Sequence, residues 1–128
     1  MNTLRVFEHE NFTARTIEDN GEIWIVAKDV AQSLGYERFD SNLLLNVPES
    51  WKGTKRIRMN LKDGRKQERE MLCLSEQGLY FFLGRSDKPK ALPYQMWIAG
   101  DVVPLLHHTG NYSMMTQQEQ VYALDRKS

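Results

Sequence analysis

Two dipeptides that favour tight turns, Asn20-Gly21 and Asp63-Gly64, each lie between runs in which apolar and polar residues alternate. Alternation with a period of two is typical of β-strands. Asn20-Gly21 suits the type I′ turn, whose two central residues need positive φ, and Asp63-Gly64 is expected at the tip of a hairpin. The runs 4–10, 14–18 and 23–26 therefore predict a small antiparallel sheet. The segment 52–74 predicts a second, longer hairpin.

Apolar residues between the two hairpins recur with the period of a helix. Over residues 27–34 they fall at i, i+3, i+4 and i+7, and Gly35 can end that helix in the left-handed conformation. A second short helix is expected after Asp40 or Ser41, either of which can cap it, and Pro48 would end it. Helix, short turn and helix is the outline of a helix-turn-helix, although any two packed short helices give the same pattern.

The outward residues of that second helix have side chains that can reach bases or phosphates. They include Asn46 and the three residues that we take as candidates for base contact, Arg38, Ser41 and Asn42. The apolar residues Leu43, Leu44 and Val47 would face the core.

The second half of the chain predicts further helices. Ser75 can cap an apolar helix that stops near Gly84, and Pro93 fits only the start of the next one. Gly100 and Pro104 predict a break or kink within this last helix, which Gly110 closes. A capping box at 116–119 allows a short C-terminal helix. The predicted class is α+β: a small antiparallel sheet and hairpins with several short helices packed on it and a C-terminal helical segment.

Composition and length bound the kind of protein. The chain has 128 residues, 41% of them hydrophobic and 27% charged, which suits one globular domain. Cys73 is the single cysteine and lies in an apolar run, so we expect core packing and a reducing compartment. No signal-peptide pattern and no membrane-length apolar stretch is present. We expect a cytoplasmic protein of a bacterial cell or an infected host, neither secreted nor bound to a membrane.

Charge is segregated along the chain. Residues 52–69 hold eight of the seventeen Lys and Arg residues but only two of the seventeen Asp and Glu residues. Cations alternate along this stretch, so the hairpin is predicted to have a basic face, and the loop 85–90 adds three cations. The candidates for phosphate contact are Lys52, Lys55, Arg56, Arg58, Lys62, Arg65, Lys66, Arg85, Lys88 and Lys90. Two alternatives are a solvated edge strand, and neutralisation by the nine acidic residues of the first fifty.

No pattern for catalysis, a cofactor or a metal is found. His107 and His108 are adjacent instead of one helical turn apart, and no matching cysteine accompanies them. No phosphate-binding loop, dinucleotide fingerprint or nucleophile elbow is present. We expect a protein that is not an enzyme and needs no cofactor.

Five segments together resemble the N-terminal domain of the BRO family, which is found in phage and prophage antirepressors and in insect DNA-virus proteins. The opening motif is Glu22 to Tyr36, and the later segments follow in the same order and spacing: Leu74 to Tyr80, Arg85 to Pro89, Gln95-Met96-Trp97, and Val103-Pro104-Leu105 with Thr109-Gly110. The resemblance implies a domain over residues 1–112, with 113–128 as a polar tail or short helix. It also implies DNA binding, and a second C-terminal domain that we expect this chain to lack. The chain departs from the family at Leu92, Pro93, His107 and His108, where basic residues are usual.

Two hypotheses follow. In the first, the domain regulates phage or prophage transcription by binding double-stranded DNA through the basic hairpin and the adjacent loop. In the second, it is an antirepressor that binds a phage repressor protein without contacting DNA. The weaker charge of the last helix and the acidic first fifty residues support the second, because an acidic surface can mimic DNA. A homodimer is compatible with both, and Val121 and Leu124 are the candidates for its contact.

Overall fold

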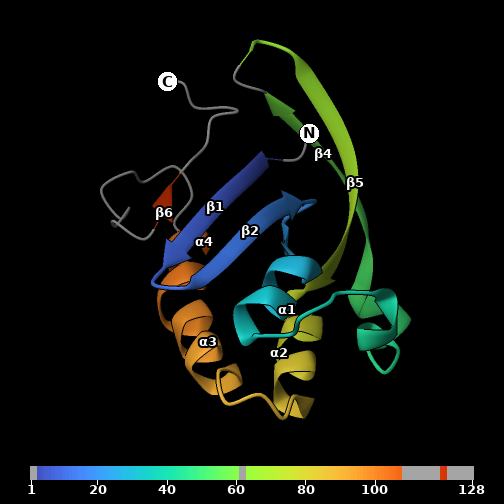
Figure 1. Ribbon diagram of the computed structural model, residues 1–128. Helices are drawn as coiled ribbons and strands as arrows, with labels where there is room; N and C mark the ends of the chain where they lie inside the picture. The colour runs from blue at the N-terminus through green and yellow to red at the C-terminus, as the bar shows by residue number, and fades with distance from the viewer. Residues whose placement is uncertain (1–2, 61–62, 108–118, 121–128) are drawn as a thin grey trace.

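The computed structural model describes residues 3–60, 63–107 and 119–120 (Figure 1). Six strands form one sheet in which every neighbouring pair is antiparallel, in the order β4-β5-β3-β2-β1-β6. The strands are β1 (Thr3–His9), β2 (Phe12–Asp19), β3 (Glu22–Val26), β4 (Lys52–Asn60), β5 (Lys66–Ser75) and β6 (Glu119–Gln120). With its helices the fold is α+β, as predicted.

The first turn has the backbone conformation that its dipeptide favours, whereas in the second only Gly64, and not Asp63, has a positive φ. The φ angles of Asn20 and Gly21 are 54° and 80°, as a type I′ turn requires. Gly64 has a φ of 91° at the end of the β4–β5 hairpin. The predicted hairpins are therefore confirmed, and the tip of the second lies where Asp63-Gly64 indicated.

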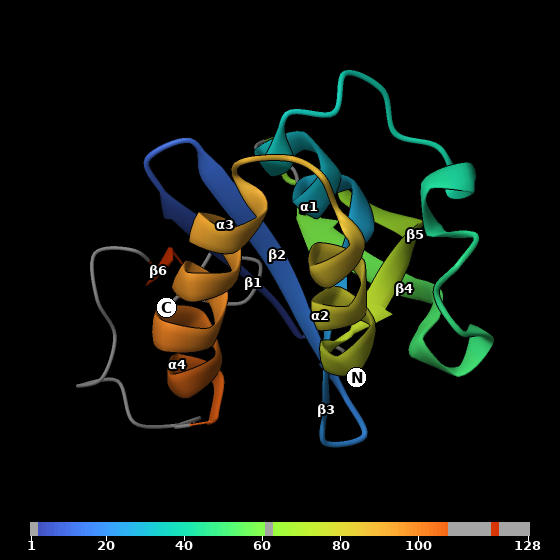
Figure 2. The same cartoon turned by 90° about the horizontal axis from the view of Figure 1, so that it is seen from below.

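The helices cover one face of the sheet, as Figure 2 shows. They are α1 (Ala27–Leu34), α2 (Glu76–Arg85), α3 (Ala91–Trp97) and α4 (Val103–His107). Gly35 ends α1 with a φ of 98°, and the Ser75 hydroxyl caps α2 by accepting a hydrogen bond from the Gly78 N–H at 3.1 Å. The main core lies between the helices and the sheet and includes Phe7 and Tyr94, both fully buried.

A π-helical turn, Ile98–Val102, separates α3 from α4. Pro104 has no N–H to donate within the helix, and its ring would crowd the carbonyl one turn before it. The wider turn around Gly100 accommodates this proline without ending the helix. The predicted kink is confirmed here. The predicted helix end at Gly110 lies outside the described residues.

The other face of the sheet is partly enclosed by the sheet itself. β4 contacts β1, although three strands lie between them in the sheet order, so the sheet curls until its two ends approach. A second apolar cluster fills the inside of this curl: Leu4, Val6, Ile17, Trp24, Val26, Ile57 and Cys73. The root of the β4–β5 hairpin is thus part of a core, while its outer half extends beyond the helices (Figure 1).

One buried ion pair joins α1 to the sheet. β2 extends past the end of β3, so the backbone N–H groups of Thr13 and Arg15 have no strand partner there, and side chains of α1 take that place. Asp29 accepts from the backbone N–H and from Nε of Arg15, both at 2.9 Å, and from its Nη2 at 2.8 Å. This hydrogen bonding raises the pKa of Arg15.

The second predicted helix differs from the expectation. The second helix is a single 3₁₀ turn, Ser41–Leu44, although Asp40 caps it as predicted by accepting from the Asn42 N–H at 2.9 Å. A four-residue turn is too short to serve as a recognition helix, so the helix-turn-helix outline is not formed. In the C-terminal segment, Glu119 pairs with Phe7 as part of β6, and the rest of the predicted tail or short helix, 113–118 and 121–128, lies outside the described residues.

Candidate nucleic-acid interface

The β4–β5 hairpin, here called the ribbon, carries its charges in cross-strand pairs. The register places Glu70 opposite Arg56 and Glu68 opposite Arg58. Nη2 of Arg56 lies 3.2 Å from Glu70, and its Nη1 lies 3.9 Å from Glu68. All three side chains are exposed, at 66% for Arg56, 45% for Glu68 and 61% for Glu70. The face that was predicted to be basic therefore also contains acidic side chains.

Two lysines at the root of the ribbon take part in the fold. Lys55 points into the curl of the sheet, where its Nζ lies 2.9 Å from Asp19 and 4.1 Å from the ring centroid of Trp24. Lys52 donates to the carbonyl of Leu44 at 2.7 Å and lies 3.8 Å from Glu49. Both lysines are largely covered, so neither is placed to contact phosphate. Neutralisation between the acidic and basic halves of the chain is thus real at these two positions.

The cations nearer the tip are more accessible. Arg65 pairs with Asp63 at 2.7 Å, whereas Lys66 and Arg69 are exposed and form no ion pair within the described part of the chain. The Arg58 side chain and Lys62 lie outside the described residues. Arg69 was not among the predicted contacts; it pairs with Ile57, and so it lies on the opposite face of the ribbon from Arg56. Once the turn was placed, strand pairing could have identified the acids Glu68 and Glu70.

A second polar surface, here called the loop surface, forms where residues 36–47 lie beside residues 81–90. The Tyr36 hydroxyl is 3.1 Å from the Ser86 hydroxyl, and the Lys88 Nζ lies 4.7 Å from the centroid of the Tyr36 ring. The base candidates Arg38, Ser41 and Asn42 are exposed on the first of these segments, and Arg85 and Lys90 are exposed on the second.

A groove crosses the loop surface. Its volume is about 190 Å³, and its lining combines three aromatic rings with aliphatic and polar side chains: Tyr36, Leu43, Asn46, Val47, Phe81, Phe82, Arg85 and Ser86. The guanidinium of Arg85 lies 5.4 Å from the centroid of the Phe81 ring. The sequence alone does not reveal this groove, because its walls come from two segments that are 34 to 50 residues apart in the chain.

The ribbon tip and the loop surface are far apart. In Figure 1 the tip of the β4–β5 hairpin lies at the top and the α2–α3 loop at the bottom. The expectation that residues 85–90 extend the basic track of the hairpin does not fit this arrangement. The predicted contact residues instead divide into two separate groups.

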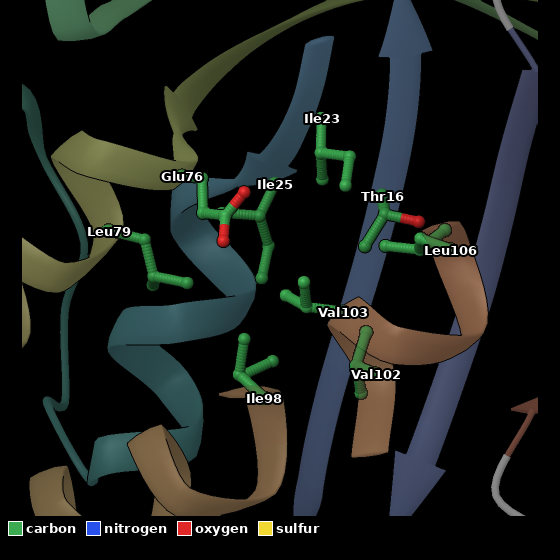
Figure 3. A pocket seen from close by; sticks show the side chains of 9 residues that line it. All are labelled: Thr16, Ile23, Ile25, Glu76, Leu79, Ile98, Val102, Val103 and Leu106. Atoms are coloured by element: carbon green, nitrogen blue, oxygen red, sulfur yellow. The ribbon is translucent and has the colours of Figure 1, made fainter. Parts of the chain in front are cut away.

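A smaller hollow lies between the sheet and the helices (Figure 3). Apart from Thr16 and Glu76, its lining is aliphatic: Ile23, Ile25, Leu79, Ile98, Val102, Val103 and Leu106. Its volume of about 10 Å³ holds one water molecule at most, so it is a packing defect and not a ligand site.

The titratable side chains Cys73 and Tyr80, which lie outside these surfaces, have structural roles. Burial raises the pKa of the Cys73 thiol to about 12, which suppresses the reactive thiolate. Burial, with Glu76 close by, raises the pKa of Tyr80 to about 12. Within the described residues no group of three or more His, Cys, Asp or Glu could hold a metal ion, and no helix is long and apolar enough to cross a membrane.

Comparisons with known proteins agree with the sequence motifs. A curated protein of Haemophilus influenzae, described as an "Uncharacterized protein", is 30% identical over 113 residues, which is 88% of this chain and 54% of that relative. No solved structure matches the chain. The model of the BRO family N-terminal domain matches residues 13–104, which include β3, α1 and the helices α2 and α3. The chain therefore belongs to the BRO family, and its matched region is that family's N-terminal domain, a phage-type regulatory domain associated with DNA binding.

Proposed function

We propose that this domain binds double-stranded DNA as part of a phage or prophage transcription regulator, and that the outer half of the ribbon lies against the phosphates. The observation that carries the proposal is the position of a cation-rich ribbon that extends beyond the body of the domain (Figure 1). Residues 52–70 contain eight cations and three acids, so the ribbon keeps an excess of positive charge despite its ion pairs. Phosphate contact does not depend on base sequence. The role is not enzymatic.

The ion pairs on the ribbon do not exclude phosphate contact. A pair between exposed side chains contributes about 0–1 kcal/mol, because water and salt screen it. Arg56 can therefore exchange Glu70 for a phosphate at little cost, and Lys66 has no ion pair to give up among the described residues. We assign phosphate contact to Arg56, Arg58, Lys62, Arg65 and Lys66, and not to Lys52 or Lys55.

The test removes two cations from the ribbon and compares the result with an equal change elsewhere. The double variant Arg56→Ala/Lys66→Ala should bind all duplexes more weakly and with similar loss, since it removes contacts that carry no sequence information. The control Lys28→Glu changes the net charge by the same two units at an exposed position on α1. Fluorescence anisotropy of random and genomic duplexes measures both. Equal affinities of the ribbon variant and the parent would refute the assignment.

The base candidates need a separate test, because the loop surface is remote from the ribbon tip. Asn42→Ala should change the preference between duplex sequences if DNA reaches the loop surface. An unchanged ranking of genomic duplexes would restrict the interface to the ribbon and leave Arg38, Ser41 and Asn42 without a role in base contact.

A second candidate function is protein binding by an antirepressor. Leu92 and Met96 lie one turn apart on α3 and are 64% and 66% exposed, which suits an apolar contact with a phage repressor. The proposed DNA mimicry has less support, because Asp19, Asp29 and Glu49 pair with cations of the same chain. Capture of a repressor at a salt concentration that removes non-specific DNA, lost in Leu92→Ser/Met96→Ser, would favour this function.

A further inference from the structure

The geometry of the loop surface points to a binding site for a single unstacked nucleotide, with its base in the groove and its phosphate against Arg85 and Lys88. The site is separate from the ribbon and does not depend on duplex binding by the ribbon.

Three aromatic side chains, Tyr36, Phe81 and Phe82, line the groove and can contact a flat ring. Tyr36 and Phe82 are tilted by 44° with their ring centroids 6.1 Å apart, and Phe81 is held edge-on against Trp51 at 5.9 Å. These contacts fix the rings before any ligand is bound. Aromatic side chains are the usual surface on which unpaired bases stack.

Polar groups at the groove match the edge and the phosphate of a nucleotide. The amide of Asn46 lines the groove, is exposed and has no hydrogen bond within the described residues. An amide can donate to and accept from one base edge, and adenine is its usual partner. Arg85 and Lys88 lie over the rings of Phe81 and Tyr36 and form no ion pair with a described carboxylate. Their charge is therefore available to an anion.

The size of the groove favours one ring system. A volume of about 190 Å³ is below the range of about 300–1,000 Å³ that is typical of sites for drug-sized ligands. An intact duplex cannot place a stacked base in such a groove, so the nucleotide must be free, lie in a single strand or be flipped out of a duplex.

The test compares two single strands that differ only in their bases. A short, fluorescently labelled oligomer of deoxyadenosine and an abasic oligomer of equal length carry the same phosphates. The parent protein should bind the first at least about fivefold more tightly, which is the lower end of what stacking of one base contributes. Equal affinity for the two oligomers would overturn the proposal, since it would show attraction to phosphate alone.

Substitution in the groove locates the effect. Asn46→Trp fills the groove and should abolish the difference between the two oligomers. Leu45→Trp is the matched control, because Leu45 is the next residue, is 69% exposed and does not line the groove. Arg85→Ala should weaken binding of both oligomers without removing an aromatic wall, and circular dichroism checks that each variant is folded. Retention of the difference in Asn46→Trp would also overturn the proposal.

Two further experiments ask whether the site takes free nucleotides or bases of a single strand, and whether the ribbon contributes to the effect. Displacement of the deoxyadenosine oligomer by adenosine monophosphate supports a site for free nucleotides, and displacement by unlabelled single strand alone supports a site for exposed bases in a strand. The ribbon variant Arg56→Ala/Lys66→Ala should keep the base-dependent difference. If this variant lost both the base-dependent difference and duplex binding, both effects would depend on the ribbon. That result would overturn the proposed nucleotide site in the groove.

Discussion

At the scale of single residues, Asp29 shows how one side chain can complete a sheet. Its carboxylate accepts three hydrogen bonds from Arg15, one of them from the backbone, at the place where β3 ends and α1 begins. The acid is buried, whereas the Arg15 side chain is partly exposed. The sequence gives no sign of this pair, because the two residues are joined only when α1 packs beside β2.

Replacement of Asp29 should therefore be costly. Asp29→Ala leaves the Arg15 guanidinium and backbone N–H without their partner, and we expect a loss of about 3 kcal/mol in the free energy of unfolding. Urea denaturation measures the change. Asp101→Ala, an exposed acid on the π turn, is the control and should stay within about 0.5 kcal/mol of the parent. A similar, small effect of both substitutions would contradict this role for Asp29.

Burial of Cys73 predicts a loss of stability at alkaline pH. The folded pKa is raised from about 9 to about 12, so the unfolded thiol loses its proton first as the pH rises. The unfolded state then binds fewer protons than the folded state, and the free energy of unfolding falls above pH 9 by up to about 1.4 kcal/mol per pH unit for this group. The raised pKa values of Tyr80 and Tyr94 act in the same direction above pH 10.

The measurement is urea denaturation between pH 7 and pH 10. Cys73→Ala should make the decline between pH 9 and pH 10 shallower, even though the substitution itself lowers stability. In the folded parent at pH 8 the thiol should also react with a thiol reagent far more slowly than in urea. Rapid modification under native conditions would show that the thiol is not buried.

At the scale of elements, the local signals were sufficient where short-range chemistry decides the structure. Asn20-Gly21, Gly35 and Ser75 each act within four residues, and the hairpin, helix end and cap that they predict are all present. Arg56 illustrates where local reasoning stops. Its acidic partners lie across the strand pair, so they enter only through the register. The groove required still longer-range contacts and could not be predicted.

The contact between α2 and Trp51 predicts opposite effects for two glycines of one helix. A Cβ at Gly78 would overlap the backbone carbonyl of Trp51, whereas a Cβ at Gly84 meets nothing within 4 Å. Gly78→Ala should destabilise the domain by about 2 kcal/mol, because the helix must move away from Trp51. Gly84→Ala should stabilise it by about 0.5–1 kcal/mol through helix propensity. Thermal unfolding of both variants checks the signs, and a stabilising Gly78→Ala would mean that α2 is not held this closely.

At the scale of the whole molecule, zero net charge does not prevent attraction to a polyanion, because the ribbon concentrates the cations. If about five of them meet phosphates, the logarithm of the duplex binding constant should fall against the logarithm of salt concentration with a slope near −4.5, since each contact contributes about −0.9. A titration at several salt concentrations gives the slope. A slope shallower than about −2 would remove the ribbon from the interface.

The curled sheet also sets how the ribbon meets a ligand. Ile57 and Cys73 anchor its root in the second core, while its tip lies outside the helices. An arm that is clamped in this way keeps its direction before any encounter, so little conformational entropy remains to be lost when it docks. Ile57→Ala, which weakens the packing at the root of the ribbon, should therefore lower the rate of association with DNA although every charge on the ribbon is kept.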